Sequence, residues 1–133
     1  MTAHSHAAAN GLDPLCVVVL DAGGHIMAVQ RHEQASIYRI DIAAAKAQGC
    51  IGMGMGGREI ARRAKGMPAL YAVFNEITRG GLIPVAGGVL IRDTAGTLIG
   101  AVGVSGDTAD NDEACACAGI TSVGLIADVG GDT

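Results

Sequence analysis

Aromatic residues are almost absent from this sequence. Phe, Tyr and Trp together make up 2% of its 133 residues, although half of the chain is hydrophobic. A core must therefore be built from Val, Ile, Leu, Ala and Met, whose small side chains let backbones pack closely. Since these residues and the 21 glycines offer little bulky apolar surface, we expect a homo-oligomer that buries more of it by self-association.

Basic charge and long apolar runs are also missing. The formal net charge is −4, so the sequence predicts no basic face for nucleic acid. No apolar run approaches the roughly 20 residues that span a bilayer, and we expect no membrane partner. Residues 1–10 lack a basic region followed by an apolar one, so no signal peptide is predicted and the expected location is cytoplasmic.

The motifs of several common enzyme classes are absent as well. There is no GxxxxGK[ST] loop, and no glycine cluster stands in a βαβ context, which argues against a nucleotide enzyme. Ser105 lies at a strand-to-helix corner without the GxSxG spacing of a serine hydrolase. Cys16, Cys50, Cys115 and Cys117 do not form a CxxC pair, and we expect small buried hydrophobes rather than metal ligands. No metal site is predicted.

What the chain does contain is a repeated hairpin pattern. The turns 21–24 and 93–96 both begin with Asp and end with Gly, as four-residue turns often do. Each lies between two apolar or β-branched runs: 15–20 and 25–30 around the first, 89–92 and 97–104 around the second. Two β-hairpins predict a mainly antiparallel sheet.

Helical periodicity fills the segments between and after the hairpins. Helices are predicted at 36–55, 58–65, 67–78 and 108–126, the second of them basic and exposed. Ser36 and either Asp107 or Thr108 are the expected N-caps. Three apolar stripes are expected to face the core: Ile37, Ile40, Ala44, Ala47 and Ile51; Leu70, Val73, Phe74 and Ile77; Ala114, Cys117, Ala118, Thr121 and Leu125.

The order of these elements predicts a single α+β domain over residues 1–133, with an antiparallel sheet of two β-hairpins and flanking helices. Within it we expect an N-terminal arm at 1–14, a core at 15–127 and a tail at 128–133.

Two groups of charged residues leave alternatives open. Lys46 could lie on a solvated face or point into a pocket as the partner of an anion. The acidic residues Asp107, Asp110, Asp112 and Glu113 could bind a divalent cation, but capping and the helix dipole explain most of the cluster.

A set of ordered motifs spans residues 15–124. They are VVLDAGGH at 18–25, Arg31 with Glu33, IAAAKA at 42–47, GGVLI at 87–91, IGAVGVSGD at 99–107 and NDE at 111–113. Together they resemble the GlcG/HbpS haem-binding family, which includes the C-terminal domain of PduO-type proteins. The resemblance implies a profilin-like layered domain in small homo-oligomers, with haem as a possible cofactor.

Carried over residue by residue, the resemblance implies a pocket lined by Arg31, Lys46, Gly87, Gly88, Ser105 and Glu113. Arg31 and Lys46 would hold carboxylates or propionates, and the glycine pair would let a ligand approach the backbone. Glu113 would accept or shuttle a proton.

Three hypotheses follow. The first is a small-ligand-binding protein whose ligand is haem or a similar anionic planar molecule. The second is a small catabolic enzyme on an organic acid, such as an isomerase, hydrolase or decarboxylase, with Arg31 or Lys46 on the carboxylate and Glu113 or His25 as acid/base. The third is a structural oligomer subunit. Axial ligation of haem would separate the first two, and the available residues are His25, Met53 and Met55.

Overall fold

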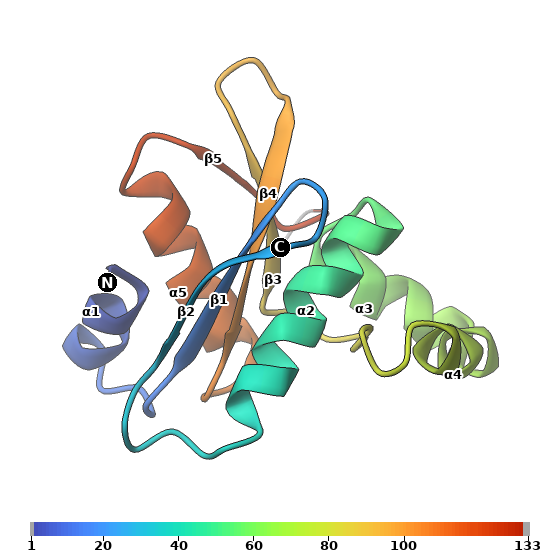
Figure 1. The fold of residues 1–133 in the computed structure, drawn as a ribbon, viewed down its shortest axis with the longest axis horizontal. Coiled ribbons are helices and arrows are strands. Elements are labelled where there is room, and N and C mark those ends of the chain that lie inside the picture. Colours follow the sequence, from blue (N-terminus) through green and yellow to red (C-terminus); the bar gives the residue numbers. More distant parts are fainter. Residues whose placement is uncertain (1, 132–133) are drawn as a thin grey trace.

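A computed structural model describes residues 2–131 as an α+β domain (Figure 1). Its helices are α1 (Thr2–Ala9), α2 (Arg39–Met53), α3 (Gly57–Gly66), α4 (Pro68–Ile77) and α5 (Ala109–Thr121). Its strands are β1 (Cys16–Asp21), β2 (Ile26–Arg31), β3 (Gly88–Arg92), β4 (Leu98–Ser105) and β5 (Ile126–Asp128). Among the described residues, no helix combines the length and apolar character needed to cross a membrane.

The sheet is antiparallel throughout, in the order β2-β1-β4-β3-β5. Its two hairpins close through the same turn chemistry. Asp21 Oδ1 accepts from the N–H groups of Gly23 and His25, and Asp93 Oδ1 accepts from those of Ala95 and Thr97. The predicted fold class is therefore confirmed.

The helices cover both faces of this sheet, as Figure 1 shows. Helix α2 lies on one face with α3 beside it, whereas α5 and α1 lie on the other face. Strand β1 alternates between the two cores: Cys16, Val18 and Leu20 pack under α2, and Val17 and Val19 face α5. Burial on both faces explains why this strand is a continuous apolar run.

Helix α2 approaches the sheet closely because two paired glycines lie beneath it. Gly88 of β3 and Gly103 of β4 are partners in the sheet register. A Cβ at Gly103 would collide with the carbonyl oxygen of Ala43, and one at Gly88 with that of Lys46. The predicted close backbone packing is therefore found where α2 crosses β3 and β4.

The predicted helix faces are partly wrong. On α2, Ile37 lies outside the helix with its side chain exposed, and Tyr38 rather than Ser36 precedes the first turn. The fully buried side of α2 includes Ala43, Lys46 and Cys50. On α5, Ala114 and Thr121 of the predicted stripe are exposed, and its other members are only partly buried. The fully buried residues are Asp112, Glu113, Cys115, Ala116 and Ile120. Both predictions assumed that the buried side must be the more apolar one.

Two further elements differ from expectation. Helix α4 buries Tyr71 but leaves Leu70, Val73 and Ile77 largely exposed. Helix α5 ends at Thr121, and the short strand β5 then pairs with β3. Strand β5 crosses the predicted boundary between core and tail; Asp132 and Thr133 of that tail lie outside the described residues.

Candidate functional site

A buried ion pair lies at the end of the sheet where β3 begins and β4 ends. Lys46 Nζ donates to Asp112 Oδ2 at 3.0 Å and to the carbonyl oxygen of Val104 at 2.9 Å. The side chains of Lys46 and Asp112 are only 5% and 1% exposed. Since α2 and α5 lie on opposite faces, this pair ties the two helical layers together around the sheet.

The backbone around this pair leaves no room for larger residues. Gly87 has φ = +119°, and a Cβ there would lie 2.8 Å from Lys46 Nζ. Asp112 Oδ1 accepts from the N–H of Asp107, so both carboxylate oxygens have partners. The fully buried Ser105 Oγ accepts from Arg39.

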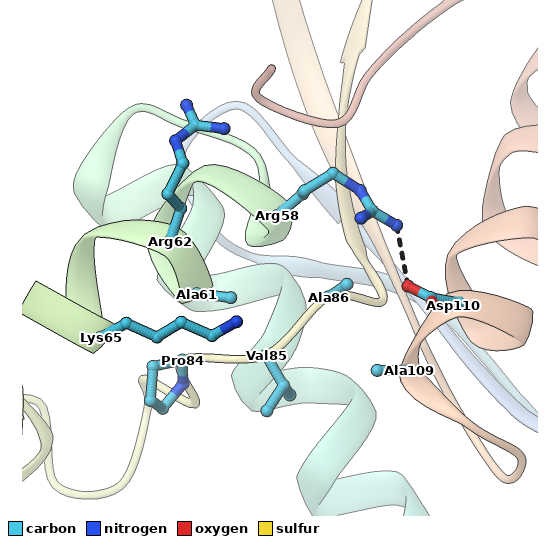
Figure 2. A pocket seen from close by; sticks show the side chains of 9 residues that line it. All are labelled: Arg58, Ala61, Arg62, Lys65, Pro84, Val85, Ala86, Ala109 and Asp110. Carbon is cyan, nitrogen blue, oxygen red and sulfur yellow. Dashed lines mark hydrogen bonds and ion pairs between the residues drawn. The ribbon is translucent and has the colours of Figure 1, made fainter. Parts of the chain in front are cut away.

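An open cleft lies next to this network, between α3, the segment 84–86 and the first residues of α5. Its volume is about 540 Å³, within the range usual for small-molecule sites. Its walls are mostly apolar or small, and its charged groups come from α3 and α5. The lining consists of Arg58, Ala61, Arg62, Lys65, Pro84, Val85, Ala86, Ala109 and Asp110 (Figure 2).

Arg58 is held across the cleft by two carboxylates of α5. Glu113 receives hydrogen bonds from Arg58 Nε and NH2, at 3.0 Å to Oε2 and 2.7 Å to Oε1, in a side-on bidentate pair. Asp110 Oδ1 accepts one further bond from NH2 at 2.8 Å. This pairing, with Glu113 first, raises the pKa of Arg58, so the guanidinium stays charged.

The two carboxylates differ in how firmly they are held. The Glu113 side chain is 9% exposed, whereas that of Asp110 is 80% exposed. No described residue accepts a hydrogen bond from NH1 of Arg58. Glu113 therefore fixes the guanidinium while leaving one of its edges available.

Lys65 is the second cation that faces the cleft. Figure 2 shows its side chain passing above Pro84, so that the ammonium group ends in the hollow near Val85. It has no partner among the described residues. Arg62 points away from the hollow in the same view, and it pairs with Glu59 at 2.5 Å. The cleft thus offers two cationic donors at separate points of an apolar wall.

The structure brings some of the predicted site residues together. Lys46, Gly87, Gly88 and Ser105 meet at one end of the sheet, and Glu113 follows Asp112 on α5. Of the two alternatives for Lys46, the solvated face is wrong, and the anion that it contacts is an internal carboxylate, Asp112. Glu113 is engaged by Arg58 rather than free in the cleft.

Arg31 and His25 do not join this group, although Arg31 lies at the same end of the sheet, in register with Cys16 and through it with Ser105. Arg31, at the end of β2, donates to the carbonyl oxygen of Ala35 at 2.7 Å and so holds the loop before α2. His25 lies in the turn at the opposite end of β1, 80% exposed, with Nδ1 3.1 Å from Asp21 Oδ1. Neither lines the cleft.

The acidic cluster is divided among separate tasks. Asp107 accepts from the side chain of Asn111 and from the N–H groups of Asp13 and Thr108, and these bonds, the Asn111 bond first, lower its pKa. Thr108 is the N-cap, since its Oγ1 accepts from the N–H of Asn111. Within residues 2–131 no group of three His, Cys, Asp or Glu side chains could hold a metal ion.

Sequence reasoning missed Arg58, Lys65 and Asp112 as site residues. Arg58, Arg62 and Lys65 stand at i, i+4 and i+7 and so share one helix face, which was the available signal. The helix predicted at 58–65 was expected only to be basic and exposed. No pattern distinguishes Asp112 from the other acidic residues that begin α5.

Comparison with known proteins identifies the family. The sequence profile of the family described as haem degrading protein HbpS-like matches residues 1–121. The chain belongs to this family. An uncharacterized 15.0 kDa protein from the dhaT-dhaS intergenic region of Citrobacter freundii is 33% identical over 99 residues, which cover 74% of this chain and 68% of that protein.

Solved structures share the fold. A PduOC:heme complex has a TM-score of 0.85 at 24% identity and covers 96% of this chain and 90% of its own. HbpS has a TM-score of 0.78 at 27% identity, covering 92% and 82%. The ORFY protein of Klebsiella pneumoniae has the same TM-score and identity, covering 90% and 81%. The predicted resemblance to this family is confirmed.

Proposed function

We propose that this protein binds a small anionic molecule in the cleft between α3 and α5, and that haem or a similar planar molecule with carboxylates is its ligand. One observation carries the proposal: Arg58 and Lys65 face an apolar cleft of about 540 Å³ with hydrogen-bond donors that no described residue uses. Charged groups of this kind recognise carboxylates. Membership of a haem-degrading family makes haem the first ligand to test.

The lining residues fit one part of haem better than another. Two propionates suit Arg58 and Lys65, and the ring suits walls such as Pro84 and Val85. The iron would find no His, Cys, Met or Tyr among the residues that line the cleft. The proposal therefore rests on carboxylate recognition and assigns no role to an axial ligand.

The enzymatic alternative has less support from the geometry. It requires an acid/base group free to reach a ligand, and the two groups predicted for that role are Glu113 and His25. Glu113 is bound by Arg58, and His25 lies in an exposed turn outside the cleft.

Self-association and a cytoplasmic location are also part of the proposal. The apolar side chains exposed on α4 and on the edge strand β2 support a homo-oligomer, since such surface favours contact with another copy. The four cysteines are free thiols, which suits a reducing compartment.

A haemin titration followed by the Soret band tests ligand binding. We expect a saturable shift, weakened about two- to fivefold in Lys65→Ala because one cation is removed from the site. Arg63→Ala is the matched control, since Arg63 is also on α3 but does not line the cleft. An absence of saturable binding would rule out haem, and equal binding by both variants would rule out this cleft.

A further inference from the structure

We infer that the cleft is a carboxylate-exchange site: the carboxylate of the ligand takes the position of Asp110 on Arg58, while Glu113 stays in place and orients the guanidinium. This inference deepens the proposed function and rests on it for the location of the site. The ligand class is a carboxylic acid with an apolar body, whether that body is a haem ring or a smaller molecule.

The first step of the argument concerns the donors of Arg58. A guanidinium has five N–H donors in a fixed planar fork. Nε and NH2 are used by Glu113 and Asp110, and NH1 is not used by any described residue. A ligand carboxylate that binds the NH1–NH2 edge in a bidentate manner needs the NH2 hydrogen that Asp110 now occupies.

The second step is the difference between the two carboxylates. Glu113 makes its bidentate contact from a buried position, so removing it would leave the guanidinium free to rotate. Asp110 makes one hydrogen bond from a side chain that is 80% exposed, and exposed ion pairs of this kind are weak. Asp110 can therefore leave at little cost, and water can solvate it.

The third step is charge. When Glu113 and Asp110 are both bound, two negative charges surround the single positive charge of Arg58. This excess of negative charge opposes the binding of an anionic ligand. Lys65 reaches the same hollow without a carboxylate partner and compensates for this. The apolar walls, including Val85 and Ala86, then contact the body of the acid.

The test compares two substitutions that remove the same charge from the same arginine. Asp110→Asn should tighten the binding of benzoate by about two- to fivefold, because a competing anion is lost. Glu113→Gln should weaken it by about tenfold, because the guanidinium loses its fixed orientation. If the carboxylates acted only through their charge, both variants would bind more tightly, and that result would overturn the inference.

Calorimetric titrations with benzoate, butyrate and haemin provide the measurement, with benzamide as the uncharged control ligand. Asp41→Asn is the control variant, because Asp41 is exposed on α2 and has no partner among the described residues. Arg58→Lys keeps the positive charge but not the planar fork of N–H donors, so it should lose benzoate binding. This second variant keeps the inference testable if Glu113→Gln does not fold. The Arg58 Nε–H signal in nitrogen-edited NMR should move in Glu113→Gln and stay in place in Asp110→Asn.

The outcomes separate this inference from the proposed function. Binding of benzoate without binding of haemin would overturn haem as the ligand and support the exchange site. Haemin binding that is unchanged in Asp110→Asn and Arg58→Lys would overturn the exchange site alone. If neither acid nor haemin binds at millimolar concentration, both are wrong.

Discussion

At the scale of single residues, the least expected feature is a lysine inside the protein. Lys46 and Asp112 are both almost fully buried, so that their charges are withdrawn from the surrounding solvent. Taking two charges out of water costs several kcal/mol per ion, which their attraction and hydrogen bonds must offset. The carbonyl oxygen of Val104 and the N–H of Asp107 complete that set of partners. The pair is therefore sensitive to the loss of either member.

We predict that Lys46→Met lowers the free energy of unfolding by about 3–5 kcal/mol, because it leaves Asp112 charged and buried without its cation. The double variant Lys46→Met, Asp112→Leu should recover a large part of this loss, since it removes both charges. Urea denaturation measures both values. Lys65→Met, an exposed lysine of the cleft, should change stability by less than about 0.5 kcal/mol. If Lys46→Met were as stable as the wild type, the buried ion pair between Lys46 and Asp112 would be contradicted.

At the scale of elements, helix α5 is organised by the carboxylates of its first turns. Asp107 precedes the helix and receives bonds from Asn111, Asp13 and Thr108, which link the N-terminal segment to α5. Asp112 is bound by Lys46 of α2, which lies on the other face of the sheet, and Glu113 is bound by Arg58 of α3. The start of α5 thus joins three other segments of the chain, namely the N-terminal segment, α2 and α3.

The lowered pKa of Asp107 predicts how this junction responds to acid. The folded state holds the charged form, chiefly through Asn111, so its contribution to stability is complete above the unfolded pKa of about 4. That contribution is lost as the pH falls through the lower pKa of the folded state. Asp107→Asn should therefore be less stable than the wild type at pH 7, and the difference should shrink below about pH 4.

Urea denaturation at pH 7, 5 and 3 tests this, with Asp41→Asn as the control for the loss of one negative charge. A difference between Asp107→Asn and wild type that stays constant over this range would contradict the prediction.

The sequence predicted these elements unevenly, and the reasons are physical. The hairpins were predictable because Asp21 and Asp93 are local: each side chain bonds to backbone two and four residues onward. The buried faces of α2 and α5 were not, because both helices are rich in Ala and Gly and bury charged residues through partners distant in sequence. Lys46 and Asp112, for example, are 66 residues apart.

The candidate site was predictable only in part for the same reason. The motif around Gly87 and Ser105 pointed to the end of the sheet that lies next to the cleft. The cleft itself depends on α3, whose basic residues have the pattern of an ordinary solvated helix face. Only the folded structure shows that α5 lies opposite them. The role of Arg58 follows from its contact with Glu113, 55 residues away, which no local pattern encodes.

At the scale of the whole molecule, the apolar surface is unevenly distributed. Helix α4 lies farther from the sheet than α2 in Figure 1, and its outer side exposes Leu70, Val73 and Ile77. Every residue of the edge strand β2 is exposed, including Met27. An amphipathic helix with its apolar side in water, and an exposed strand at the edge of a sheet, are surfaces that another chain can cover.

We therefore expect the protein to sediment well above the 13.3 kDa of a single chain and to lose that assembly when charge is placed on α4. Val73→Asp would put a carboxylate at the centre of the exposed apolar side of α4, so association through this surface would bury an unpaired charge and be prevented. Thr94→Asp, in the exposed turn of the second hairpin, adds the same charge elsewhere and should leave the assembly intact.

Met27→Asp distinguishes the two exposed surfaces. If Met27→Asp dissociates the protein and Val73→Asp does not, the interface is strand β2 and not α4. A wild-type protein of 13.3 kDa at all concentrations in sedimentation velocity would contradict self-association altogether.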